Sequence, residues 1–136
     1  MGPGDAKRVA AAAHLFDGPP LAEAVTRFLD DTGHHLLIAY RDDVPVGFVS
    51  GVEVTHPDKG TEMFLYELGV DSGYRHHGIG TALVEKLAEL ARSKDCYGMW
   101  VLVDDENAAA AATYRKAHGD VESQPLMFSW RFKPSV

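Results

Sequence analysis

The loop from Arg75 to Gly80 carries the strongest chemical signal in the sequence, and it reads Arg-His-His-Gly-Ile-Gly. Two glycines one residue apart let a backbone approach a ligand closely, and the start of the amphipathic segment that follows adds a partial positive charge. With the Arg75 guanidinium, these groups suit a phosphate or pyrophosphate. The alternative is a tight turn whose glycines serve packing alone. Leu83 stands where a dinucleotide fingerprint has its third glycine, and no Gly-Lys-Thr or Gly-Lys-Ser follows as in a Walker loop.

Glu67 is the second candidate for chemistry. It lies in the apolar segment 62–70, where a carboxylate without a partner would be costly to bury. We expect either a cleft, in which it would act as a general base or anchor an amine, or a structural ion pair. Strict strand alternation places Glu67 on the face opposite Phe64, Tyr66 and Leu68, unless a β-bulge shifts the alternation.

Hydrophobic periodicity predicts the elements that position these residues. Helices are expected over 5–16, 21–29, 78–94 and 107–117, and strands over 35–40, 46–55, 62–70, 97–103 and 126–132. This order indicates a single α/β domain over residues 1–136, with one mixed, mostly antiparallel sheet and helices on both faces. The strand–helix–strand unit from 62 to 103 predicts a parallel pair by the right-handed crossover rule.

The composition excludes several classes of protein. The 136 residues include 13 Lys and Arg against 20 Asp and Glu, a net charge of −7, which argues against a nucleic-acid binder. The acidic balance suits a cationic partner, or is simply a solvated surface. The single cysteine, Cys96, excludes a disulfide framework, and the seven histidines lack helical ligand spacing, so no metal is expected. Without a signal peptide or a membrane-spanning run, the expected location is cytoplasmic.

A resemblance to a known family lies in residues 74–83, Tyr-Arg-His-His-Gly-Ile-Gly-Thr-Ala-Leu. This segment resembles the Arg/Gln-x-x-Gly-x-Gly/Ala motif of the GNAT superfamily of acetyl-CoA-dependent N-acetyltransferases. The element order also matches, as does Asn107 followed by Tyr114, so the resemblance covers roughly residues 9–132. Residues 66–71, Tyr-Glu-Leu-Gly-Val-Asp, more narrowly resemble the aminoglycoside 3-N-acetyltransferases, which have Tyr-Asp-Leu-Ala-Val there.

The resemblance implies acetyl-CoA as cosubstrate, with its pantetheine arm between splayed strands 62–70 and 97–103. The residues implied to hold it are Leu68, Gly69, Val70, Arg75, His76, His77, Gly78, Ile79, Gly80, Thr81, Asn107 and Tyr114. The backbone amides of the glycine loop would bind the pyrophosphate, and an amide of strand 62–70 would hold the acetyl carbonyl. Tyr114 matches the tyrosine that protonates the departing thiolate in this superfamily. The alternative is a tyrosine packed on the core.

The resemblance also implies an acceptor site. Glu67 aligns with an aspartate of the narrower subfamily and is implied as base or amine anchor. The other acids expected near the acceptor are Glu62, Asp104, Asp105 and Glu106. For the last three the competing interpretation is capping of the helix 107–117, with Asp104 or Asp105 as N-cap and Glu106 complementing the helix dipole. The implied reaction is direct transfer, in a ternary complex, to a primary amine, foremost the 3-amino group of an aminoglycoside. The alternatives are another small amine, a protein amine, or a coenzyme A-binding module without catalysis.

One feature departs from the family pattern. Family members usually begin with a strand before the first helix, whereas Gly2, Pro3 and Gly4 disfavour a strand here. The first strand is therefore expected to be missing or truncated. A sheet without it has a bare edge, and we expect a homodimer to cover that edge.

Overall fold

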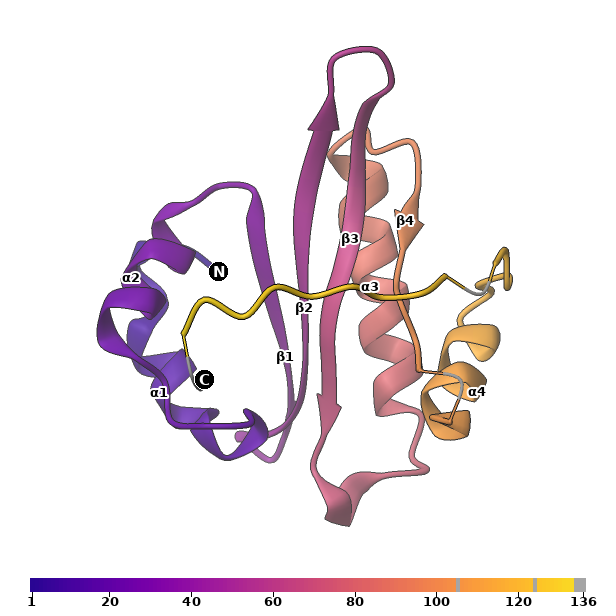
Figure 1. Ribbon diagram of the computed structural model, residues 1–136. Coiled ribbons are helices and arrows are strands. Elements are labelled where there is room, and N and C mark those ends of the chain that lie inside the picture. Colours follow the sequence, from indigo (N-terminus) through magenta and orange to yellow (C-terminus); the bar gives the residue numbers. More distant parts are fainter. Residues whose placement is uncertain (105, 124, 134–136) are drawn as a thin grey trace.

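A computed structural model describes residues 1–104, 106–123 and 125–133 of the chain (Figure 1). Its helical elements are η1 (Pro3–Asp5), α1 (Ala6–Ala11), η2 (Ala13–Leu15), α2 (Ala22–Asp30), η3 (Ser72–Tyr74), α3 (Ile79–Ser93) and α4 (Ala108–Lys116). Its strands are β1 (His34–Arg41), β2 (Val44–His56), β3 (Gly60–Val70) and β4 (Met99–Trp100). They form one sheet in the order β1-β2-β3-β4, antiparallel except for the parallel pair β3–β4. The predicted mixed sheet and its parallel pair are confirmed.

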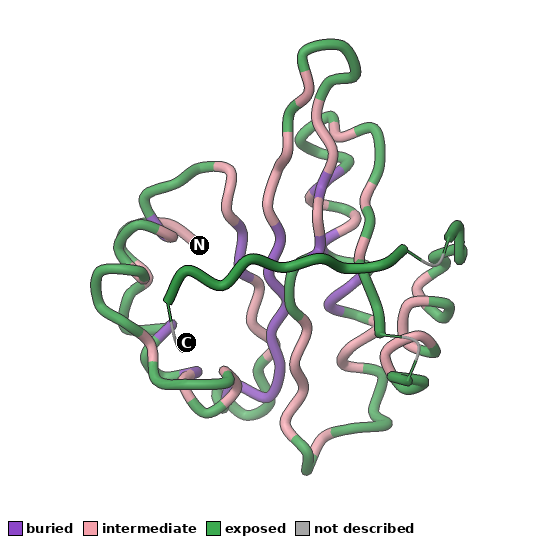
Figure 2. The backbone as a smooth tube through the Cα atoms, viewed as in Figure 1, coloured by how far each residue is buried: buried purple, intermediate pink, exposed green. Residues whose placement is uncertain are grey.

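Helices cover both faces of the sheet, as predicted, and each face has its own core. The first core lies between α3 and the sheet, and its buried members are Val49, Met63, Leu65, Leu83, Val84, Leu87 and Ala91. The second lies under α1 and α2, and its buried members are Val9, Leu29, Leu36 and Phe48. Figure 2 shows these buried positions along the middle of the strands and on α3. Burying side chains of this kind contributes about 1.5–3 kcal/mol each, so the two cores fix the helices on the sheet.

The first predicted helix, 5–16, is broken into three short pieces, and its prediction as one helix is wrong. Ala12 ends α1 with φ −96° and ψ 10°, and Phe16 is extended at φ −91° and ψ 160°. The extended backbone brings the Phe16 ring edge-on to Phe48, with ring centroids 4.9 Å apart. A continuous helix would forgo this core contact, which sequence periodicity does not reveal.

Two predicted strands also differ from the structure. The strand over 97–103 is reduced to Met99–Trp100, and residues 126–132 form no strand within the described chain. The C-terminal segment passes across the strands in Figure 1, in front of the sheet, rather than alongside one of them. Because a strand needs a neighbour running alongside to share its ladder, this course leaves the segment unpaired. Leu126 is 83% exposed and Phe132 is 91% exposed.

Candidate functional site

The glycine loop ends at the start of α3 in a form that suits an anion. Gly78 precedes the helix in the left-handed region, at φ +79°, and His76 also has a positive φ of 67°. In the described part of the chain, no side chain caps this helix start, and the first turn contains no acidic residue. The first-turn amide N–H groups and the positive end of the helix dipole are therefore available to a phosphate.

Three elements meet around Gly80. A Cβ atom at this position would lie 3.3 Å from Thr113 Cγ2, 3.7 Å from Val70 Cγ2 and 3.8 Å from Leu68 Cδ2. The end of β3, the first turn of α3 and the middle of α4 are therefore in contact. Arg75 ties the loop to β3, because its Nε donates to the carbonyl of Val70 at 3.4 Å. The structure thus brings together most of the residues predicted to hold acetyl-CoA.

The second half of β3 has an edge that no strand covers. β3 pairs with β4 only at Met63–Met99 and Phe64–Trp100, preceded by a backbone bond from Tyr97 N–H to the Thr61 carbonyl. Beyond Phe64, no residue of β3 has a β4 partner among the described residues. Backbone groups on such an edge can pair with an extended ligand that carries amide groups. This local opening fits the predicted insertion of a pantetheine arm.

A β-bulge in β3 sets the direction of Glu67. Ser50 pairs with Glu67, but the next residue, Gly51, pairs with Leu65, so Tyr66 is the extra residue. The Ser50 hydroxyl accepts a hydrogen bond from the Glu67 N–H at 3.2 Å, and Ser50 itself is only 7% exposed. This bond holds the bulge from the neighbouring strand.

The bulge places Glu67 on the same face as Phe64 and Tyr66, so the expectation from strict alternation is wrong. All three residues line one pocket, whereas Leu65 and Leu68 pack in the core under α3. The bulged alternative, which the sequence left open, is the one that the structure adopts. Glu67 therefore faces the pocket from β3. This strand pairs with β2 on one edge, and its other edge is uncovered beyond Phe64.

The pocket lies between α1, α2 and the outer face of the sheet, and its volume is about 510 Å³. Aromatic rings form much of its wall, and they belong to Phe16, Phe28, Phe48, Phe64 and Tyr66. Partial burial raises the pKa of the Glu67 carboxyl, and the nearby Asp17 carboxylate raises it further. A carboxylate that is made more basic in a cleft is suited to accept a proton or bind an amine.

Tyr114 lies in α4 and packs against the core under α3. Burial raises the pKa of its phenol. The residue thus has the packing that the structural alternative predicted, and it also lies one position from Thr113, which contacts the start of α3. Its role as an acid remains a prediction.

The other predicted site residues at α4 have local partners. Asn107 is the N-cap of α4, and its side chain accepts from Ala110 N–H at 3.0 Å. The expectation that Asp104 or Asp105 is the N-cap is therefore wrong for Asp104, which instead accepts from Glu106 N–H at 3.3 Å. Asp105 lies outside the described residues. Neither Asp104 nor Glu106 lines the pocket that holds Glu67.

Glu62 lies at the far end of β3, outside the pocket lining. It accepts hydrogen bonds from Tyr97 at 2.9 Å and from His56 at 3.1 Å. Both hydrogen bonds lower the pKa of the Glu62 carboxyl, and the bond from His56 has the larger effect. Glu62 therefore differs from Glu67 in its surroundings, and its pKa is lowered whereas that of Glu67 is raised.

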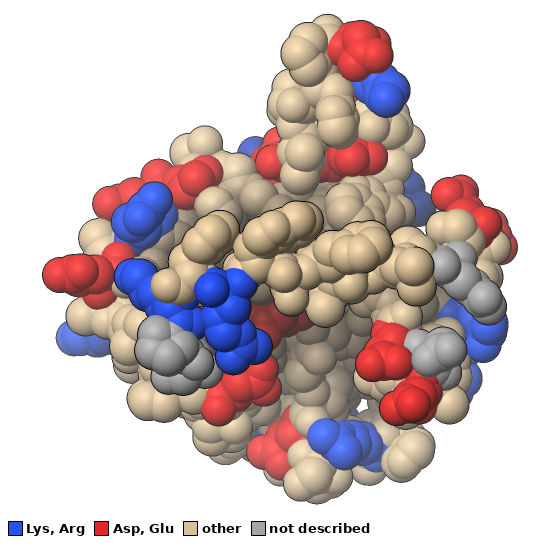
Figure 3. Space-filling model, viewed as in Figure 1, with Lys and Arg blue, Asp and Glu red and all other residues tan. Residues whose placement is uncertain are grey.

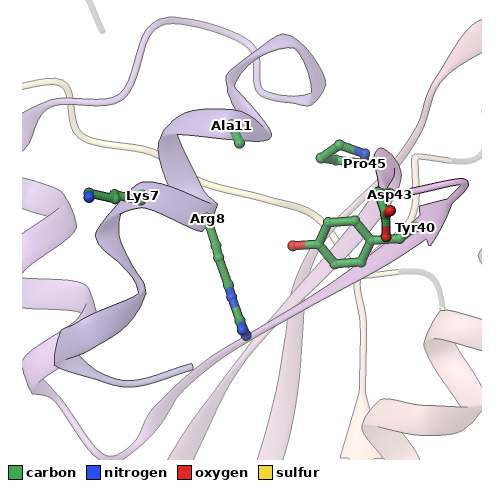
Figure 4. Close-up of a pocket in the computed structure, with 6 residues that line it drawn as sticks. All are labelled: Lys7, Arg8, Ala11, Tyr40, Asp43 and Pro45. Atoms are coloured by element: carbon green, nitrogen blue, oxygen red, sulfur yellow. The ribbon is translucent and has the colours of Figure 1, made fainter.

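A second hollow, of about 470 Å³, lies between α1 and the β1–β2 turn (Figure 4). Arg8 extends toward it from the helix and Tyr40 from the strand, with Lys7 and Asp43 nearby. It contains none of the residues predicted for catalysis or for cosubstrate binding.

Sequence reasoning missed two contributors to the site. The Ser50 hydroxyl accepts the hydrogen bond that fixes the bulge, and the Asp17 carboxylate raises the pKa of Glu67. Neither has a sequence signal, because both depend on contacts between residues far apart in the chain. Phe64 also lines the pocket, and its ring stacks on Trp100 with ring centroids 4.2 Å apart.

Two further properties concern metals and membranes. Over residues 1–104, 106–123 and 125–133, no three His, Cys, Asp or Glu side chains gather as metal ligands would. Within the same residues, no helix has the length and apolar character to cross a bilayer.

Comparisons with known proteins agree with this geometry. Among curated proteins, L-2,4-diaminobutyric acid acetyltransferase of Shouchella clausii is 30% identical over 89 residues, which are 65% of this chain and 47% of that protein. The chain thus spans about half the length of this relative.

Solved structures share the fold. An aminoglycoside acetyltransferase from an uncultured soil metagenomic sample, in complex with sisomicin, superposes with a TM-score of 0.89 at 18% identity, covering 98% of this chain and 93% of that one. AAC(6')-Iy with a coenzyme A bisubstrate analogue has a TM-score of 0.80, also at 18% identity, covering 96% and 95%.

The family model of the acetyltransferase (GNAT) family matches residues 9–120. This match spans most of the chain, including the glycine loop, the bulged strand and α4. It agrees with the fold, with the glycine loop at the start of α3 and with the uncovered edge of β3. The chain therefore belongs to the GNAT family of acetyltransferases.

Proposed function

We propose that the chain transfers an acetyl group from acetyl-CoA to a primary amine of a small molecule. The observation that carries this proposal is the bulge at Tyr66, which turns Glu67 into a pocket beside the uncovered edge of β3. One strand thus offers its backbone to a cosubstrate arm and a carboxylate to an acceptor. The uncapped start of α3 suits the pyrophosphate of the same cosubstrate.

Bound acetyl-CoA would supply an activated acetyl thioester. When the amine attacks its carbonyl carbon directly, a carbon–nitrogen bond forms and the carbon–sulfur bond breaks. Glu67 binds the amine and takes the proton that the nitrogen must lose, directly or through water. A backbone N–H of Leu68, Gly69 or Val70 stabilises the negative charge on the acetyl oxygen, a contribution of about 3–4 kcal/mol for one donor. Tyr114 gives a proton to the departing sulfur. An acceptor bound as an ammonium group thus loses two protons from nitrogen: one balances the proton that Tyr114 gives to sulfur, and the other is released to solvent.

Two classes of acceptor are candidates. The sequence resemblance favours an aminoglycoside attacked at its 3-amino group, and the aminoglycoside acetyltransferases among the solved structures support such a compound as a test acceptor. The specific observation that favours another small amine is the apolar lining of the pocket around Glu67.

The test is thiol release from acetyl-CoA by the purified chain and by Tyr114→Phe. We expect the parent to release thiol in the presence of a primary amine, and the variant to lose turnover by about 10²-fold or more while its affinity for coenzyme A stays the same. Calorimetry measures that affinity. Coenzyme A binding without thiol release from any amine would indicate a binding module and contradict the proposed function.

A further inference from the structure

The residues that line the pocket around Glu67 restrict the kind of acceptor that can bind there. Most of its wall is apolar, and its polar side chains are those of His34, Ser50, Tyr66 and Glu67. Among the described residues that line the pocket, Glu67 is the only acid, and none is Lys or Arg. One negative charge at the sheet side of an aromatic pocket matches one positive charge on a ligand.

Two of the other polar side chains of the lining lie beside protein groups. The Ser50 hydroxyl is bonded to the Glu67 backbone, and His34 Nδ1 lies 3.0 Å from Asp31 Oδ2. Four polar side chains in an otherwise apolar lining are few for a ligand that carries many hydroxyl or amino groups. Such a ligand would lose water from its polar groups against phenylalanine rings without replacing those hydrogen bonds.

The other acids considered as substrate contacts lie outside the pocket lining. Glu62 is bonded to His56 and Tyr97 beyond the pocket lining, and Asp104 is bonded to the backbone before α4. Asp17 is exposed and outside the lining, although it is near enough to act on Glu67. Figure 3 shows a band of uncharged side chains across the front of the molecule, along the course of the C-terminal segment in Figure 1, with acidic side chains below it.

We propose that the acceptor is a primary amine with a single positive charge on an apolar or aromatic body, such as an arylalkylamine or a medium-chain alkylamine. The ammonium group contacts Glu67, and the body packs against Phe16, Phe28, Phe48 and Phe64. The cavity of about 510 Å³ is in the range of small-molecule binding sites and is large enough to hold such an amine. This inference rests on the proposed function and narrows its acceptor.

The first experiment compares acceptors by thiol release from acetyl-CoA. Phenethylamine and hexylamine represent the proposed class, while spermidine and gentamicin represent polycations. We expect kcat/KM for phenethylamine to exceed that for either polycation by about tenfold or more. Calorimetric titration of phenethylamine into the protein, without cosubstrate, should detect binding that Phe28→Ala weakens.

A second experiment adds charge to the pocket without endangering the fold. Leu21 lines the pocket, is 68% exposed, and is the N-cap of α2, where it makes no capping hydrogen bond. Leu21→Asp supplies a preferred capping residue and a second carboxylate, and Leu21→Asn supplies the cap without the charge. We expect Leu21→Asp, but not Leu21→Asn, to raise the ratio of spermidine to phenethylamine kcat/KM by about two- to fivefold.

The outcomes separate this inference from the proposed function. If gentamicin or spermidine matches or exceeds phenethylamine and hexylamine in the parent protein, the apolar-acceptor inference is overturned and the acetyltransferase stands. If no amine supports thiol release although coenzyme A binds, both are overturned. Equal effects of Leu21→Asp and Leu21→Asn would also contradict the inference, because charge would then play no part.

Discussion

At the scale of single residues, Glu67 and Tyr114 are shifted in the same direction by burial. Desolvation raises the pKa of both groups, with Asp17 adding to the effect on Glu67. The shift makes the Glu67 carboxylate a better base than an exposed one, and it keeps the Tyr114 phenol protonated to higher pH. A base that is ionised and an acid that is protonated can therefore coexist over a wide pH range.

Replacing Glu67 tests its part in the proposed reaction. We expect Glu67→Gln to lower turnover by about 10²–10⁴-fold if the carboxylate is the base, because the amide cannot accept the proton. If the carboxylate only anchors the amine, KM for the amine should rise and kcat should change little. Steady-state kinetics distinguish the two, and Glu85→Gln, on the exposed side of α3, is the matched control.

The raised pKa of Glu67 also predicts a pH dependence. Activity should fall as the pH decreases through a value above the ordinary 4.5, because protonation removes the base. The effect of Glu67 on stability should have the opposite sign. Lowering the pH should make Glu67 less destabilising, since the folded state disfavours its carboxylate form. At neutral pH we expect Glu67→Gln to have the higher Tm, and the difference should disappear once the pH is below 4.5. A higher Tm for the parent at neutral pH would contradict this assignment.

At the scale of elements, the site depends on two local departures from regular geometry. The bulge in β3 brings Glu67 to the pocket face, and the left-handed residue before α3 directs the loop into the helix start. Both occur where β3 and α3 approach α4, so the irregular backbone is held by the two cores on either side of the sheet.

Ser50→Ala removes the side chain that holds the bulge. We expect the free energy of unfolding to fall by about 1–2 kcal/mol, because the Glu67 N–H loses its partner. Turnover should fall by more than the folded fraction does, since Glu67 would no longer be fixed toward the pocket. Thr55→Ala is the matched control, because it removes an exposed hydroxyl bond to Thr61 on the same strand pair. Equal activity in the two variants would argue against a positioning role for Ser50.

Substitution of Gly78 should strain the backbone rather than cause a steric clash. Its φ is +79°, while a Cβ atom there would meet nothing within 4 Å. We expect Gly78→Val to reduce the Tm shift produced by coenzyme A strongly, and Gly78→Asn to reduce it less, because asparagine tolerates this conformation. Gly98→Val is the control, since that position is equally open and has no positive φ. Full coenzyme affinity in Gly78→Val would contradict the proposed pyrophosphate site.

At the scale of the whole molecule, the C-terminal segment is the least integrated part. Phe128, Trp130 and Phe132 are 75–91% exposed, and the segment is exposed along its course in Figure 2. Contiguous exposed apolar side chains of this kind are typical of surfaces that bind another protein. This surface adds a second reason, beside the free edge of β1, to expect the homodimer that the sequence suggested.

Association should therefore depend on these aromatic side chains. We expect the parent to form a dimer that sedimentation velocity resolves from the monomer at higher concentration. The double variant Phe128→Ser and Trp130→Ser should remain monomeric, with the Tm that the parent has when it is too dilute to dimerise, because these side chains take no part in either core. A monomeric parent at all concentrations would contradict the expected dimer.

The sequence by itself determined the strands β1, β2 and β3, the helix α3 and the glycine loop. Their signals are local: apolar alternation in the strands, helical spacing from Ile79 to Leu90, and two glycines before a helix start. The sequence also indicated that Glu67 needs a cleft or a partner, since its strand is otherwise apolar. These inferences needed no knowledge of which distant residues touch.

Only the tertiary structure decided where Glu67 points. The bulge depends on Ser50 in the neighbouring strand, and the aromatic wall depends on Phe16 leaving its helix to meet Phe48. The C-terminal segment reads as a strand, yet it crosses the sheet without a partner, because pairing is a property of two segments. Contacts between residues far apart in the chain thus fixed the face, the charge and the lining of the proposed acceptor site.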